Sequence, residues 1–100
     1  MNQSFKQFIT ETGDSGPAYI EMVKKHANAS SLDQKTAELA YISVLSAVRI
    51  HDGLAFHVQS AKKLGATREE IISAVLVGLP AVGLTVVASL EETLRSYDEA

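Results

Sequence analysis

Two side chains in this sequence, Glu38 and His57, are of types that move protons in enzymes. Glu38 begins the stretch ELAYISVLSAV, whose other residues are apolar or small. A carboxylate on such a helix face loses part of its hydration and therefore holds its proton more tightly, which suits a general acid or base near neutral pH. The alternative is a carboxylate at the helix edge, paired with Lys35 or Arg49, and the pattern alone favours this simpler interpretation.

His57 lies in the stretch LAFHVQSAKKLGA, at the border of a predicted buried stripe made of Leu54, Val58, Ala61 and Leu64. A single histidine in such a place is more often a hydrogen-bonded core residue than a catalyst. A Glu38–His57 pair would need two helices packed antiparallel across a turn at Asp52. Glu38 lies about 21 Å before that turn and His57 only about 7 Å after it, so a simple hairpin leaves them about 14 Å apart. The spacing therefore predicts contact only if the hairpin is splayed or a neighbouring subunit completes the site.

Three further residues are candidates for substrate binding. Arg49 is either a surface cation at a helix end or an anion clamp for a carboxylate substrate. Tyr41 is expected to be half-buried, with its hydroxyl hydrogen-bonded, and His51 to interact with a helix C-terminus. No HxxxH or HxH pair joins His51 to another histidine, so no metal site is predicted, and nothing in the sequence calls for a cofactor.

Helices must position these residues, because the apolar residues recur at helical spacing along the sequence. This periodicity predicts an all-α chain of about six helices that form one domain, residues 1–100. Ser31 or Asp33 can cap the third helix, and Asp52 the fourth. Thr67 and Glu70 have the spacing of a capping box at the start of the fifth. The predicted helices cover residues 5–9, 17–27, 34–50, 54–64, 67–77 and 81–96.

The composition narrows the classes of function. Of the 100 residues, 46% are hydrophobic and 21% charged, and this apolar excess favours burial against further copies of the chain. A net charge of −3 without a basic cluster argues against nucleic-acid binding. The chain contains no cysteine, which excludes disulfides, thiolate metal sites and thiol nucleophiles.

The location of the protein in the cell is predicted from two segments of the sequence. The N-terminal stretch MNQSFKQFIT lacks the basic and apolar regions of a secretory signal, so a cytoplasmic protein is expected. Residues 71–90 carry no charge and are long enough to span a bilayer. Pro80 within the run, its glycine and hydroxyl residues and its acidic flanks favour two buried helices joined at residues 78–80 over a membrane span.

The segment from Leu32 to Pro80, in particular LDQKTAEL and FHVQSAKKLGATREEI, resembles the carboxymuconolactone decarboxylase family, which includes the alkylhydroperoxidase D-like proteins. The resemblance implies an alkylhydroperoxidase D-like helical fold and assembly into homotrimers or homohexamers. In the peroxidase-like branch the pattern is a glutamate, a CxxC pair and a histidine. Glu38 and His57 fall on the glutamate and the histidine, whereas Ile50 and Gly53 stand at the two cysteine positions.

Without sulfur no dithiol cycle can turn over, so peroxidase activity is expected to be absent. The decarboxylase branch, which is similar in lacking the CxxC pair, implies a thiol-independent lyase or isomerase acting on a small carboxylated metabolite. Glu38 and His57 would then exchange protons, and Arg49 could hold the substrate carboxylate. The alternative is a non-enzymatic oligomeric or ligand-binding module that keeps the scaffold, and the sequence does not decide whether the chain is an enzyme.

Overall fold

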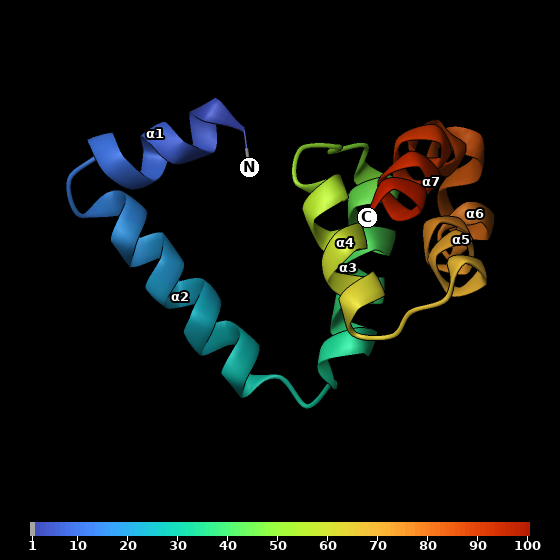
Figure 1. Cartoon of the computed structure of the whole chain (residues 1–100), viewed down its shortest axis with the longest axis horizontal. Helices are drawn as coiled ribbons and strands as arrows, with labels where there is room; N and C mark the ends of the chain where they lie inside the picture. Colours follow the sequence, from blue (N-terminus) through green and yellow to red (C-terminus); the bar gives the residue numbers. More distant parts are fainter. Residues whose placement is uncertain (1) are drawn as a thin grey trace. The chain divides into compact units, whose positions relative to one another are not determined.

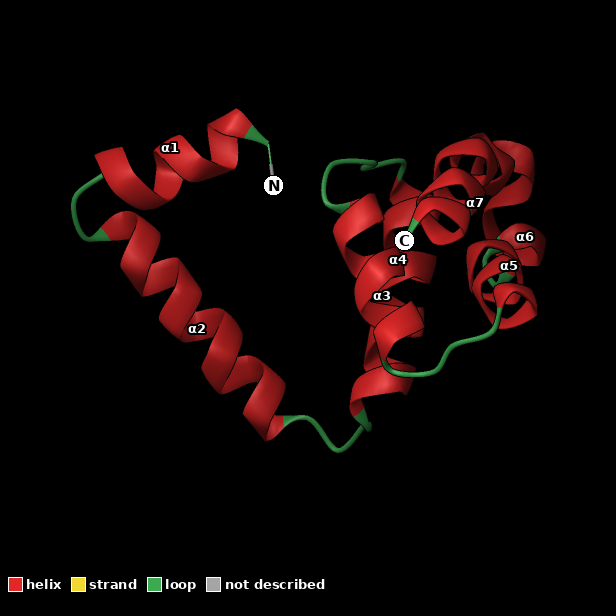
Figure 2. Ribbon diagram, in the orientation of Figure 1, coloured by secondary structure: helices red, strands yellow, loops and turns green. Residues whose placement is uncertain are grey.

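The computed structural model describes residues 2–100, and these contain helices and connections but no strand, as the sequence predicts (Figures 1 and 2). The chain divides into two compact units, residues 1–32 and 33–100. The first holds α1 and α2, and the second holds the other elements. In chain order they are α1 (Gln3–Glu11), α2 (Ser15–Ala29), α3 (Gln34–Val48), α4 (Leu54–Lys63), α5 (Arg68–Leu76), α6 (Leu79–Val82), the 3-10 helix η1 (Gly83–Ser89) and α7 (Leu90–Glu99).

The first unit is a helical hairpin that depends on one close approach. Gly16, at the start of α2, is the only buried residue among residues 2–32. A methyl group on Gly16 would lie 2.7 Å from the Cα of Ile9, so only glycine allows α1 and α2 to pack at this distance. Phe8 and Tyr19 pack edge to face next to this contact, with ring centroids 5.6 Å apart.

The second unit contains the hydrophobic core. Helix α3 packs against α4 and α5, and α7 packs against α4 and α5 in turn. Between α3 and α5 the Ser43 hydroxyl donates a hydrogen bond of 2.6 Å to the Ala74 carbonyl. The small side chains of these two residues permit this contact between the helices. The core cluster consists of Ile42, Leu45, Leu54, Val58, Ala61, Ala66, Ile71, Ala74 and Val75. Leu64, predicted to belong to the buried stripe of α4, is instead 37% exposed because it follows the last turn of that helix.

Most of the predicted helix caps are confirmed. The Asp33 carboxylate accepts a hydrogen bond of 2.8 Å from the Thr36 amide at the start of α3. Thr67 and Glu70 form the predicted capping box of α5, each side chain accepting from the other's backbone amide. The Asp52 cap was wrong, because Gly53 occupies the cap position of α4 and no side chain bonds the amides there.

The apolar run at residues 71–90 is broken more often than predicted. Helix α5 is buried along one face, but the expected helix 81–96 divides into α6, η1 and α7. Gly83, with φ of 80° and ψ of −162°, ends α6 in a conformation that only glycine adopts easily. By length and composition residues 68–99 could cross a membrane, because an 18-residue window within them has a mean hydropathy of 2.4, with 22% of that window buried. These breaks interrupt a straight span, and the membrane-free assignment stays a prediction.

Candidate functional site

Glu38 on α3 and His57 on α4 meet within a single chain. The Nδ1 atom of His57 lies 2.7 Å from Oε2 of Glu38. The two side chains are 19% and 22% exposed, so the pair is largely but not completely removed from water. The 14 Å separation estimated from helix rise was therefore wrong. The alternative ion pair between Glu38 and Lys35 was also wrong, because the Lys35 ammonium group instead lies 2.9 Å from the Glu70 carboxylate.

The contact depends on where α3 ends and how the chain returns. Helix α3 stops at Val48, and Arg49 takes a left-handed conformation with φ of 59° while the Ile50 amide bonds back to the Leu45 carbonyl at 3.1 Å. This stop reduces the axial offset between Glu38 and His57 to about 10 Å. The Glu38 and His57 side chains meet across the remaining offset, as their 2.7 Å contact shows.

Aromatic rings enclose the imidazole of His57. The Tyr41 ring, one turn after Glu38 on α3, stacks on it with centroids 3.9 Å apart and planes inclined by 20°. Phe56, the residue before His57, meets it edge to face at 5.3 Å and 85°. Tyr41 is 47% exposed, and its hydroxyl makes no hydrogen bond within residues 2–100, contrary to the predicted partner. Phe56 was missed from the sequence; its position next to His57 was the only signal.

The other two predicted site residues are not joined to the pair. Arg49 is exposed at the end of α3, and no ion pair of the described residues includes it. His51 is partly buried, and its Nε2 atom is enclosed without a hydrogen-bond partner among those residues. Its predicted interaction with a helix C-terminus is therefore not made through Nε2. The structure brings together Glu38, His57 and Tyr41, and leaves the roles of Arg49 and His51 as predictions.

The hydrogen bond between the pair defines which atom can react. A neutral imidazole that donates its Nδ1 proton to the Glu38 carboxylate has its lone pair on Nε2. When Nε2 takes a proton, the resulting imidazolium is stabilised by the adjacent carboxylate. The arrangement can thus accept and return one proton at Nε2, with Glu38 orienting the ring. No cluster of three or more histidine, aspartate or glutamate side chains that could hold a metal occurs in the described part of the chain.

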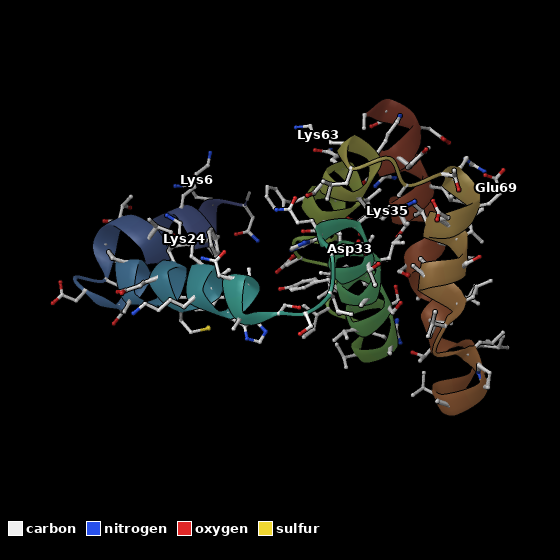
Figure 3. The ribbon with its side chains drawn as sticks, turned by 90° about the horizontal axis from the view of Figure 1, so that it is seen from below. Lys6, Lys24, Asp33, Lys35, Lys63 and Glu69 are labelled. Atoms are coloured by element: carbon white, nitrogen blue, oxygen red, sulfur yellow. The ribbon has the colours of Figure 1, made fainter. Side chains whose placement is uncertain are left out.

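Two surface cavities of the second unit are lined by residues other than Glu38 and His57. The larger, about 520 Å³, is an open groove between α3 and α5 floored by small and apolar residues such as Ala40, Ser43 and Ala74. Figure 3 labels Glu69, on the rim of this groove, and Lys35, which pairs with Glu70 beside it. The smaller, about 120 Å³, lies along α4 beside Phe56.

Comparison with known proteins gives one match. Residues 14–94 match the family model described as the carboxymuconolactone decarboxylase family. This match extends the resemblance seen at Leu32 to Pro80 in both directions, and it includes α2, the whole α3–α4 hairpin and half of α7. No curated protein and no solved structure matches the chain.

Proposed function

This chain belongs to the carboxymuconolactone decarboxylase family, and we propose that it catalyses a thiol-independent proton transfer, a lyase or isomerase step on a small carboxylated metabolite. The observation that supports this proposal is the 2.7 Å hydrogen bond between Glu38 and His57 in a partly buried setting. A carboxylate that orients an imidazole is a recurring arrangement for general acid–base catalysis. The absence of cysteine removes the dithiol chemistry of the peroxidase-like branch.

In this mechanism His57 is the proton carrier. Its Nε2 atom abstracts a proton from a carbon next to the substrate's carbonyl group, or returns one to the carbon from which carbon dioxide leaves. Glu38 orients the ring and stabilises the imidazolium. Arg49 is proposed to hold the substrate carboxylate, and His51 to line the same surface; both roles come from residue type and chain position.

The direct test measures carbon dioxide release from a carboxymuconolactone, the compound in the family's name. We expect His57→Ala to abolish turnover and to leave the oligomeric state unchanged, as judged by sedimentation. His26→Ala, at an exposed histidine of α2, is the matched control and should keep wild-type turnover. If the His57→Ala variant still turns over the substrate, this mechanism is refuted.

A second candidate is a non-enzymatic oligomeric or ligand-binding module. It is favoured by one observation, that the groove of about 520 Å³ between α3 and α5 is lined by residues other than Glu38 and His57. A thermal-shift screen with small mono- and dicarboxylates separates the two candidates, because a ligand at a hundred times its Kd adds about 2.7 kcal/mol to stability. Stabilisation by a carboxylate that is never consumed supports the module, whereas consumption of it supports the enzyme.

Both candidate functions include the proposal that the chain assembles into homotrimers or homohexamers. Its support is the apolar surface along α3, where Tyr41, Val44 and Val48 are 47%, 60% and 55% exposed. Large apolar side chains gathered on one helix face are typical of surfaces that bury against a partner. Sedimentation equilibrium of the purified chain determines the number of copies, and a monomer at micromolar concentration would exclude this assembly.

A further inference from the structure

The ring of His57 is restrained by more than its hydrogen bond. The hydrogen bond from Nδ1 to Glu38 limits rotation of the ring about its Cβ–Cγ bond, but the carboxylate is carried by a flexible side chain that can follow the ring. The torsion that turns a histidine ring has a broad energy minimum, so hydrogen bonding alone leaves the direction of Nε2 loosely defined. A second contact on the face of the ring removes this freedom.

Tyr41 supplies that contact. Its ring lies 3.9 Å from the imidazole centroid and only 20° from parallel, so it covers one whole face. Phe56 meets the same imidazole at 85°, so its contact is edge to face. Tyr41 and Glu38 lie three residues apart on α3 and therefore share one helix face, from which both reach His57.

The phenol hydroxyl of Tyr41 has no part in these contacts. It makes no hydrogen bond within the described residues, and nearly half of the side chain is exposed. Burial of the tyrosine in the core therefore does not explain its position, and neither does a hydroxyl partner. Its specific contact among the described residues is the stacking of its ring on His57.

We propose that Tyr41 is a positioning residue: its ring, stacked on His57, fixes the imidazole plane so that Nε2 keeps one direction. The phenyl ring is what the role requires, and the hydroxyl is dispensable. The consequence for catalysis rests on the proposed function, because it matters only if Nε2 exchanges a proton with a substrate. The consequence for ring geometry stands independently of any activity.

The test is nuclear magnetic resonance of the full chain labelled with ¹⁵N-histidine. In the wild type, ring currents from Tyr41 should move the His57 carbon-bound protons upfield, and long-range ¹H–¹⁵N correlations should show the proton on Nδ1. Tyr41→Phe should keep both signals. Tyr41→Ala should lose the upfield shift and lower the Nδ1–H population. Gln34→Ala, at an exposed residue of the same helix outside its apolar surface, is the matched control and should leave both unchanged.

Activity provides a second, separable measurement. With a carboxymuconolactone as substrate, Tyr41→Ala should lower kcat about tenfold with little change in KM, since loss of orientation raises the barrier without removing a substrate contact. Tyr41→Phe should keep the wild-type kcat. If Tyr41→Ala keeps the wild-type tautomer and folds normally, the positioning role is overturned. If the spectra change as expected but wild-type protein releases no carbon dioxide, the proposed function fails and the positioning role stands.

Discussion

The strength of the Glu38–His57 contact can be measured by a double-mutant cycle. The variants are Glu38→Ala, His57→Ala and the double variant, each unfolded in urea at pH 7. A hydrogen bond to a charged group contributes about 1.5–3 kcal/mol. About a fifth of each side chain is exposed, so water competes for this bond and we expect a coupling free energy near the lower limit, about 1.5 kcal/mol.

A matched control lies in the same unit. Glu91 and Arg95 on α7 approach to 3.9 Å, but their side chains are 92% and 56% exposed. Their cycle should give less than about 0.5 kcal/mol, as exposed pairs one helical turn apart do. A Glu38–His57 coupling no larger than that of the control would refute the inference that this contact is a strong, oriented hydrogen bond.

Two further predictions concern stability. Backbone hydrogen bonding from Thr67, together with Lys35, lowers the pKa of Glu70 below its ordinary value of 4.5. The carboxylate therefore stabilises the fold above that value, and this contribution is lost as the pH falls through the lower pKa of the folded state. Glu70→Gln should flatten the acid side of a plot of melting temperature against pH, and an unchanged slope would contradict this. Gly16→Ala should open the α1–α2 hairpin, seen as faster amide exchange in both helices, because the added methyl would overlap Ile9; protection equal to wild type would show that the close approach is not needed.

Features set by neighbouring residues were predictable from the sequence. The Asp33 cap and the Thr67–Glu70 capping box each depend on side chains within three residues of the amides they bond. The starts of α3 and α5 were located for the same reason. The break at Gly83 was not predicted, because an apolar run with helical spacing gives no sign of where the helix tightens into a 3-10 turn.

The proximity of Glu38 and His57 could not be obtained by counting helix rise. That estimate took the helix to continue to Asp52, whereas the chain leaves α3 at Arg49 through a left-handed residue. Arginine rarely adopts positive φ, so its type gave no warning. Once the helix is shortened, fewer helical residues separate Glu38 and His57 from the connection between α3 and α4, and the estimated axial offset falls from about 14 Å to about 10 Å.

The same connection explains how the chain keeps an acid–base pair without a thiol. Ile50 and Gly53 stand where the resemblance places the two cysteines of the peroxidase-like branch. Gly53 has φ of 82° and is the residue from which α4 begins, with its carbonyl accepting from the His57 amide at 3.1 Å. Any other L-residue at this position, cysteine included, would be strained in that conformation. In this backbone glycine starts α4 at position 53 without strain, whereas a cysteine there would have to bear the strain of a positive φ.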